Sequence, residues 1–392
     1  MTTHPNQSRR FSWPRRIGLV LAASITLALP ACGESNVAGD DAAVSSPAQN
    51  SVGEEVSEVD GDLPEVTPDF SWPEASPPAG HYPVTVESCG EEVTFDEAPK
   101  RAVVNDDNMV ELMFALGLTD HMAAYAAVGP RLQLAAFEDD YAAVDYLGDD
   151  YFSLEPTMGA NPDFVFSGWN YGFDAEGINP EGLNQLGVKS YALNESCRRI
   201  DDTLEPASIE EWYGDVRNIA DVFGVPERAE ALIAHWDQRL AQVEARIPAD
   251  AEPVRVFSYG FGDDAPGGGL GLTIVPELYR RAGAVNVFED LLEMWGTVSW
   301  ESFIESQPDV IVVTDYGSGQ TGEEKIKFLK SVKGNEVVPA VADDRFLVLP
   351  QEAVNPGIRI VDGIEELAAM LYPDAFEDVV DTDGFGLAPT ND

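Results

Sequence analysis

Aromatic side chains follow the predicted strands in two separate parts of the chain, and they are the residues best suited to contact a ligand. Rings at strand ends offer stacking and apolar surface, which is the chemistry of recognition rather than of catalysis. In open α/β sheets, ligands bind beyond the carboxyl ends of the strands, so we expect these rings to line one cleft. Each ring taken alone fits packing at the edge of a core equally well. The candidates are Trp169, Tyr171, Phe173, Tyr259, Phe261, Trp295, Trp300 and Tyr316.

Polar residues near the same strand ends add possible hydrogen bonds and charge. Asn105 and Asp106 close the first strand of the predicted fold. Asp106 and Asp107 could hold a hard cation, although two adjacent carboxylates are more often a solvated strand end. Arg131 and Arg359 are the basic candidates. Either arginine could pair with an anionic ligand or form a surface salt bridge. We include Asn105, Asp106 and both arginines in the predicted binding set.

The sequence contains no set of residues that predicts catalysis or a metal cage. It has no G-x-S-x-G nucleophile motif and no separable Ser, His and Asp set. Its 70 acidic residues are too numerous for any pair of carboxylates to indicate a glycosidase. No two of its four histidines are paired at ligand spacing: His4, His81, His121 and His235. We expect no enzyme activity, no cofactor and no protein-bound metal, with a hydrolase as the alternative.

One glycine motif requires a second alternative. Residues 317–322 match G-x-G-x-x-G between a predicted strand and a predicted helix, which is the context of a dinucleotide site. The other interpretation is a glycine-rich turn at the mouth of a cleft. We favour the turn, because the motif lies in the second copy of a repeated unit.

The repeated unit consists of a short helix followed by a buried strand. Ser153, Glu155 and Asp163 recur with the same spacing as Ser299, Glu301 and Asp309. In each copy, Ser is a plausible N-cap, Glu lies in the first helical turn, and Pro before the Asp ends the helix. An apolar run then predicts a buried strand. Two copies predict one α/β architecture built twice.

The repeats imply a domain order. Apolar positions over residues 207–247 recur at helical spacing and predict a helix, a turn and a longer helix that could join two lobes. The fold class is therefore α/β, with two lobes that each hold a parallel-rich sheet flanked by helices, joined by one long interlobe helix. The expected segments are a signal peptide (1–31), a disordered tether (32–81), an N-terminal lobe (82–205), an interlobe helical segment (206–250), a C-terminal lobe (251–373) and an acidic tail (374–392).

The N-terminus and the net charge indicate where the protein works. Four arginines precede an apolar run over residues 17–29, which is too short to span a bilayer comfortably. The run ends in Leu-Pro-Ala-Cys-Gly, which resembles a bacterial lipobox with Cys32 as the lipidated residue; an ordinary secretory signal is the alternative. The net charge of −47 disfavours binding to nucleic acid and to anionic membrane surfaces. We expect a protein outside the cytoplasm, anchored to the bacterial cell membrane by lipid.

Two cysteines remain when Cys32 is set aside. Cys89 and Cys197 form an even pair, and an exported chain can oxidise such a pair to a disulfide. Two free thiols are the alternative.

Several short segments, in this order and spacing, resemble the substrate-binding lipoproteins of ABC importers for iron–siderophore complexes, which have a rigid interlobe helix. The matching segments are 98–104, 111–112, 116–118, 161–165, 186–188, 282–288, 298–301 and 307–311. The cysteine pair and the loop 168–173 are similar to actinobacterial members. The resemblance implies a monomer that captures a ferric siderophore between its lobes and delivers it to a permease. Related members bind cobalamin or haem.

The resemblance also implies surface glutamates that dock on basic pockets of the permease. Glu176 or Glu181 in one lobe and Glu323 or Glu324 in the other open the helices after the paired strands, and we take them as the candidates. Few arginines are predicted near the cleft, so a hydroxamate or mixed siderophore fits at least as well as a catecholate. A surface interaction protein without a small ligand is the remaining alternative.

Overall fold

The computed structural model of this chain describes residues 66–67, 70–74, 76–126, 133–201, 203–381 and 387–389. They belong to one compact unit, Val59–Asp392. The predicted signal peptide, Cys32 and Arg131 lie outside the described residues. Within the described part, no helix combines the length and the apolar character needed to cross a membrane.

The N-terminal lobe is built on a sheet whose strands pair in parallel. Its order is β5-β4-β3-β6-β7, and β8 also pairs with β6. The strands are β3 (Ala102–Asn105), β4 (Met122–Ala126), β5 (Asp145–Tyr146), β6 (Phe164–Trp169), β7 (Gly172–Phe173) and β8 (Lys189–Ala192). A separate hairpin precedes them, formed by β1 (Val84–Ser88) and β2 (Glu91–Phe95).

The C-terminal lobe repeats this core. Its four-stranded parallel sheet has the order β11-β9-β13-β14, formed by β9 (Val254–Tyr259), β11 (Ala284–Asn286), β13 (Val310–Asp315) and β14 (Phe346–Pro350). In the N-terminal sheet the matching order is β4-β3-β6-β8. Both cores therefore place the second strand of the lobe first, then the first, third and fourth. This common order confirms the predicted fold class of one α/β architecture built twice.

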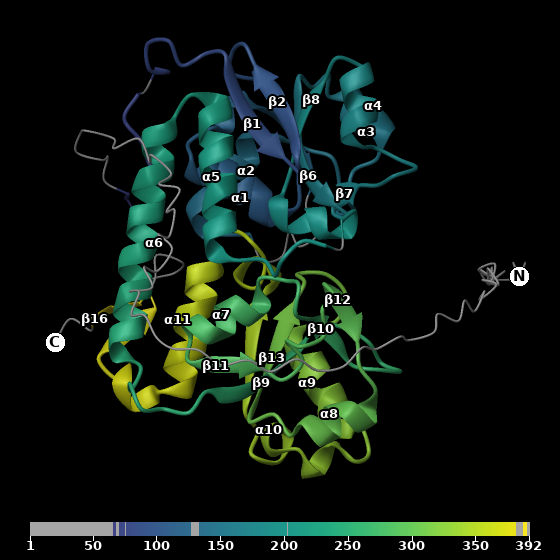
Figure 1. Cartoon of the computed structure of the whole chain (residues 1–392), viewed down its shortest axis with the longest axis vertical. Coiled ribbons are helices and arrows are strands. Elements are labelled where there is room, and N and C mark those ends of the chain that lie inside the picture. Colours follow the sequence, from purple (N-terminus) through teal and green to yellow (C-terminus); the bar gives the residue numbers. More distant parts are fainter. Residues whose placement is uncertain are drawn as a thin grey trace, which may run out of the picture. The chain divides into compact units, whose positions relative to one another are not determined.

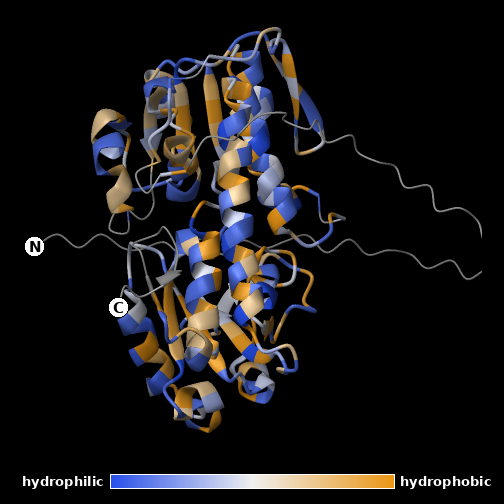
Figure 2. Ribbon diagram, turned by 90° about the vertical axis from the view of Figure 1, so that its left-hand side faces the viewer, coloured by the Kyte–Doolittle hydropathy of each residue, from blue (hydrophilic) through white to orange (hydrophobic). Residues whose placement is uncertain are grey.

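Helices cover both faces of each sheet (Figure 1). The helices of the N-terminal lobe are α1 (Asp107–Ala115), α2 (Glu138–Ala143), α3 (Leu154–Gly159) and α4 (Pro180–Gln185). Those of the C-terminal lobe are α7 (Val275–Arg281), α8 (Trp300–Ser306), α9 (Gly322–Ser331), α10 (Pro339–Ala342) and α11 (Ile360–Leu371). The strands between them are largely hydrophobic (Figure 2). One core cluster includes residues from both sheets, and two smaller clusters fill the opposite faces.

The predicted pair of interlobe helices is present as α5 (Ile209–Phe223) and α6 (Pro226–Arg246). Ser208 caps α5 by accepting the backbone N–H of Glu211 at 3.2 Å. Gly224, with φ 71°, ends α5, and Pro226 opens α6. At 21 residues, α6 is about 30 Å long and runs beside both lobes (Figure 1). Arg239 of α6 forms an ion pair with Glu365 of α11 at 2.8 Å, which attaches the helix to the C-terminal lobe.

Both ends of the folded unit extend beyond the predicted boundaries. Residues expected in the tether pack on the N-terminal lobe: Phe70 is buried, and the indole N–H of Trp72 donates to the Ala115 carbonyl at 2.7 Å. In the predicted tail, Phe376 is buried, and β15 (Val379–Asp381) pairs with β16 (Leu387–Pro389). Aromatic anchors therefore bind segments whose composition predicted loose chain.

Candidate ligand-binding site

The repeated aspartates anchor strands. Asp163 accepts the backbone N–H groups of Lys100 and Arg101, both at 2.9 Å, just before β3. Asp309 accepts the backbone N–H of Arg255 at 3.2 Å in the matching strand β9. These bonds fix neighbouring strands relative to each other, so the repeated spacing serves the fold and the residues beyond the strands are left for recognition.

Asn105, at the end of β3, positions two loops of the site. Its side chain is fully buried, and its carbonyl oxygen accepts the backbone N–H of Phe152 at 3.0 Å. Its amide nitrogen donates to the backbone carbonyl of Tyr171. Tyr151 and Tyr171 are thus held through one buried amide, and their rings meet edge-on with centroids 6.5 Å apart. Asn105 was predicted as a ligand contact, but its side chain is buried and instead holds the two backbone segments in place.

Tyrosines from both lobes gather beyond the strand ends. Burial raises the pKa of Tyr151, and Asp106, Tyr171 and Tyr316 raise it further, which places the Tyr316 side chain of the C-terminal lobe near Tyr151. Tyr151 is still 42% exposed, so it offers surface to a ligand. The Tyr316 ring lies over the ammonium of Lys325, with the nitrogen 4.4 Å from the centroid. The Tyr316 hydroxyl of the C-terminal lobe is therefore within electrostatic range of Tyr151 in the N-terminal lobe.

Three hydrogen-bond donors in this region have no acceptor. The Tyr171 hydroxyl, Arg199 Nε and Trp295 Nε1 are buried atoms without a hydrogen-bond partner. Burial raises the pKa of Tyr171 and Glu195 adds to this, whereas Arg199 and Trp295 lower it, so the three donors lie near one another. Because unpaired buried donors are costly, such a group is suited to oxygen atoms of a ligand.

Asp106 lies at the junction of the lobes. It is buried, caps α1 through the Asp107 N–H at 3.0 Å and accepts a hydrogen bond from Gln351 of the C-terminal lobe at 3.1 Å. Burial raises its pKa to about 6, although both bonds lower it. The sequence favoured a solvated strand end over a cation site for Asp106 and Asp107, but both side chains are buried, and Asp106 serves for capping and for lobe contact. Among the described residues, no group of three or more His, Cys, Asp or Glu could hold a metal ion.

Arg359 forms a second contact between the lobes. It forms a bidentate ion pair with Glu111 of α1, in which Nε donates at 2.8 Å, and the Glu111 side chain has no exposed surface. Burial alone would lower the pKa of Arg359, but Glu111 raises it. Nearby, burial raises the pKa of Glu352 well above its ordinary value. In this conformation Arg359 pairs with protein rather than with a ligand.

Several predicted ring contacts lie elsewhere. Phe173 and Tyr259 have no exposed surface and belong to core clusters, so neither can contact a ligand in this conformation. Trp300 packs on Phe303, with ring centroids 5.8 Å apart. Phe261 is 37% exposed on a loop that bridges to the glycine strand β10 (Gly267–Gly269).

Trp169 lies apart from the tyrosine group. It lines a pocket of about 690 Å³ on the N-terminal lobe. The other walls of this pocket are formed by β2, β8 and α4, and they include Glu181.

In the glycine motif, the side chain of Asp315 binds two backbone N–H groups. Asp315 accepts the backbone N–H of Gly317 at 2.9 Å and that of Gly322 at 3.1 Å. A carboxylate in this position repels phosphate and takes up two N–H groups that a dinucleotide would need. The turn interpretation therefore holds over the dinucleotide alternative.

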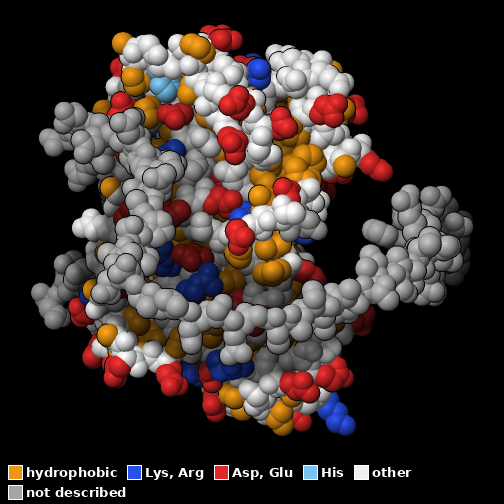
Figure 3. Space-filling model, in the orientation of Figure 1, with side chains coloured by type: hydrophobic (Ala, Val, Ile, Leu, Met, Phe, Trp, Pro, Cys, Tyr) orange, Lys and Arg blue, Asp and Glu red, His pale blue; other side chains and the backbone are white. Residues whose placement is uncertain are grey.

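The four candidate glutamates are exposed on helices or the loops that precede them. Glu324 forms a capping box with Thr321, and Glu181 accepts a hydrogen bond from Gln185 at 3.4 Å. Glu176 and Glu323 are exposed. On the face shown in Figure 3, acidic side chains are spread over both lobes, which matches the net charge of −47.

Sequence reasoning missed Tyr151, Arg199 and Gln351. Tyr151 lies in a polar stretch without strand periodicity, and Gln351 follows β14 in a short 3-10 turn. Arg199 ends the turn that carries Cys197, which was considered only for its sulfur. That sulfur is bonded to Cys89, so the predicted disulfide is confirmed.

The chain matches known proteins over most of its folded part. Residues 103–353 match the family model for periplasmic binding proteins, which is more than half of the chain. An uncharacterized ABC transporter substrate-binding lipoprotein from Bacillus subtilis is 23% identical over 309 residues, covering 76% of this chain and 88% of the relative. A vitamin B12-binding protein from Yersinia pestis is 25% identical over 219 residues, covering 56% of this chain and 70% of the relative.

A solved structure shares the fold. It is described as an ABC-type Fe3+-hydroxamate transport system from Saccharomonospora viridis, with a TM-score of 0.64, 24% identity, and coverage of 74% of this chain and 99% of that chain. Two repeated lobes, a long helix beside both and the family match lead to one conclusion: the chain belongs to the periplasmic binding protein family, and it is a solute-binding protein, not an enzyme.

Proposed function

We propose that this protein is the lipid-anchored, extracytoplasmic binding component of an ABC importer and that it captures a ferric siderophore between its lobes. The observation that carries the proposal is the group of Tyr151, Tyr171 and Tyr316 from both lobes, together with the buried donors of Arg199 and Trp295 beside the Tyr171 hydroxyl. A ferric siderophore offers apolar surface to the rings and oxygen atoms to the donors. The lipoprotein relative and the Fe3+-hydroxamate structure support this assignment.

The charges near the tyrosines favour one class of chelate. Arg199 is the single cation among the donors, and it lies near Glu195, while Asp106 lies near Tyr151. A ligand with several negative charges, such as a tris-catecholate complex, would be repelled by these carboxylates once they ionise. A hydroxamate or mixed siderophore carries less net negative charge and fits better.

Cobalamin is the second candidate. Two observations favour it over haem. The chain is 25% identical to a vitamin B12-binding protein. Cobalamin also lacks the two carboxylates that haem would bring to this acidic surface.

Titration distinguishes these ligands. Purified protein, residues 66–392, is titrated with ferrioxamine B, ferric enterobactin, haemin and cyanocobalamin, and tryptophan fluorescence is measured. We expect quenching at micromolar concentration or below with ferrioxamine B and little with ferric enterobactin. Trp295→Phe should remove part of the quenching, whereas Trp212→Phe, a variant of a buried side chain in α5, should not. A dissociation constant of 100 micromolar corresponds to a binding free energy of about −5.5 kcal/mol. If none of the four ligands binds with a dissociation constant below this value, the proposal is wrong.

Anchoring and docking are tested separately in cells. Cys32→Ser should release the protein from the membrane fraction. Reversing charge at Glu181 and Glu323 together should reduce uptake while leaving the affinity for the chelate unchanged. Reversal at Glu87, an exposed glutamate of the hairpin, is the matched control.

A further inference from the structure

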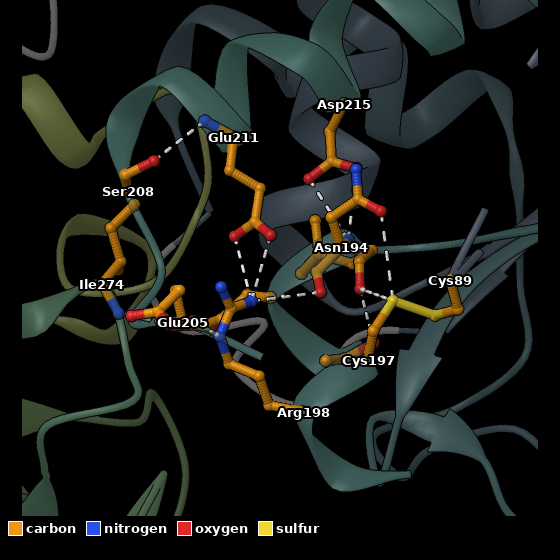
Figure 4. A network of polar contacts seen from close by, with 12 residues as sticks. Cys89, Asn194, Cys197, Arg198, Glu205, Ser208, Glu211, Asp215 and Ile274 are labelled. Atoms are coloured by element: carbon orange, nitrogen blue, oxygen red, sulfur yellow. Dashed lines mark hydrogen bonds and ion pairs between the residues drawn. A yellow bond between two sulfur atoms is a disulfide. The ribbon is translucent and has the colours of Figure 1, made fainter. Parts of the chain in front are cut away.

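The 3-10 turn η4 (Asn194–Arg199) is held by the N-terminal lobe on one side (Figure 4). Arg198 pairs with Glu211 of α5 at 3.0 Å and donates to the Glu205 carbonyl at 2.6 Å. Asp215 of α5 accepts the backbone N–H of Asn194 at 3.2 Å. These bonds attach the turn to the first interlobe helix.

The same turn contacts the C-terminal lobe. Glu195 is buried, and its carboxylate accepts the backbone N–H of Ile274, just before α7, at 2.8 Å. At three residues per turn, the six residues of η4 span about two turns, so Glu195 and Cys197 lie within one turn of each other. Any displacement of η4 therefore changes the lobe contact as well.

The disulfide is the covalent anchor of η4. Cys197 is bonded to Cys89, which lies in the tight turn of the β1–β2 hairpin. A two-stranded hairpin is marginally stable alone, and this one is further held where Ser88 accepts the Ala192 N–H at 2.8 Å. The hairpin and η4 thus brace each other through the two sulfurs.

The last residue of the turn, Arg199, lies in the ligand site. Ser196 accepts the backbone N–H of Trp169 at 2.9 Å, which ties η4 to the end of β6. Gly168 allows this approach, because a Cβ there would lie 2.6 Å from the Tyr171 ring and 3.2 Å from Ser196. Arg199 lies close enough to Tyr171 to lower its pKa, and its Nε has no acceptor.

We propose that the Cys89–Cys197 disulfide positions Arg199 for ligand binding. Through η4, it holds the guanidinium beside the Tyr171 hydroxyl and the Trp295 indole, so that the three groups together donate hydrogen bonds to an anionic oxygen of the ligand. Arg199 is the binding residue, and the disulfide is the positioning element. Through the bond from Ile274 to Glu195, the position of the same turn also depends on contact with the C-terminal lobe. This inference rests on the proposed function for the nature of the ligand, but the mechanical link can be tested without one.

A double-mutant cycle tests the positioning role. The probe is ferrioxamine B, or whichever chelate of the titration above binds most tightly. Arg199→Gln should weaken binding about 10- to 100-fold, since a charged hydrogen bond is lost, and Arg199→Lys should weaken it less. The double variant Cys89→Ser/Cys197→Ser should also weaken binding, and adding Arg199→Gln to it should cause little further loss. Lys100→Gln, an exposed charge change, is the matched control and should bind as the wild type does.

Additivity would overturn the proposal. If the losses from the cysteine changes and from Arg199→Gln multiply, the disulfide acts through something other than Arg199. Unchanged affinity in the cysteine variant would overturn it equally. Melting temperatures of each variant, measured without ligand, confirm that binding is compared between folded proteins.

Hydrogen exchange tests the link without ligand. In the folded cysteine variant, amide exchange should rise about 10-fold or more at residues 193–200 and also at 272–276, because Glu195 moves with the turn. Faster exchange confined to the hairpin, residues 84–95, would contradict the proposal. A wild type that binds no chelate, combined with coupled exchange, would leave the positioning link intact and count against the proposed function alone.

Discussion

The N-terminal and C-terminal lobes share one four-strand parallel core but end their strands differently. In the C-terminal lobe, Asp315 folds its loop back on the strand end and takes up the glycine N–H groups. In the N-terminal lobe, Asn105 holds the backbone of the two segments that carry Tyr151 and Tyr171, and a disulfide-anchored turn adds Arg199. The duplicated scaffold therefore leaves strand ends free to diverge, and most of the polar groups proposed for recognition lie in one lobe.

The largest expected effect tests how the two unlike lobes are joined. Glu111→Ala leaves Arg359 buried without its carboxylate, and we expect the free energy of unfolding to fall by about 3–5 kcal/mol. Urea denaturation measures it. Glu97→Ala is the control: it breaks the exposed Lys100 pair and should change stability by less than about 1 kcal/mol. Equal losses in the two variants would show that Glu111 does not join the lobes.

A pH effect should come from the N-terminal side of the junction. Burial raises the pKa of Glu195 to about 7, so the folded state holds its proton more tightly than the unfolded state. The stability that the protonated Glu195 contributes to the folded state is fully present below about pH 4.5, and it is lost as pH rises through about 7. Between pH 5 and pH 8, we expect the free energy of unfolding of the wild type to fall by about 2–3 kcal/mol more than that of Glu195→Gln. Urea denaturation at each pH measures both values. Parallel pH profiles in the two proteins would contradict this assignment.

The repeated aspartates should differ by the number of their bonds. Asp163 accepts two backbone N–H groups and Asp309 accepts one, so we expect losses of about 2 and about 1 kcal/mol for the alanine variants. Thermal unfolding of both variants gives the comparison. A larger loss for Asp309→Ala would mean that the strand anchors are not equivalent in the way their spacing suggests.

The smallest effect distinguishes the two serines that precede α3 and α8. Ser299 accepts the backbone N–H of Ser302 at 3.0 Å, whereas the Ser153 hydroxyl makes no capping bond. Ser299→Ala should lower stability by about 1 kcal/mol, and Ser153→Ala should leave it unchanged within error. The change in urea midpoint measures both, and similar losses would show that the caps are alike in solution.

The fold was largely predictable because its signals are local. Pro308 after a short helix, the apolar run of β13 and the spacing of Trp212, Val216 and Ile219 each specify an element through backbone sterics or periodic burial. The site was only partly predictable. The proposed site keeps Tyr171 and Tyr316, predicted from their places after strands, and Trp295, predicted from its place beside the second repeated unit. Phe173 and Tyr259 also follow predicted strands, but they are buried. The direction of a side chain depends on which face of its strand is covered, and that is not local.

The sequence by itself indicated the two lobes, the first, third and fourth strands of each sheet core and the long helix, because propensity and periodicity act through near neighbours. It favoured the pairing of Cys89 with Cys197 over two free thiols, and the structure shows the bond. Only the tertiary structure decided what lies in the site. Arg359 was drawn into a buried pair with Glu111, 248 positions away, while Arg199 was left with an unpaired nitrogen beside Tyr171. The physical reason is that a charge takes the partner that folding brings within a few ångströms, and this partner is set by the packing of whole lobes.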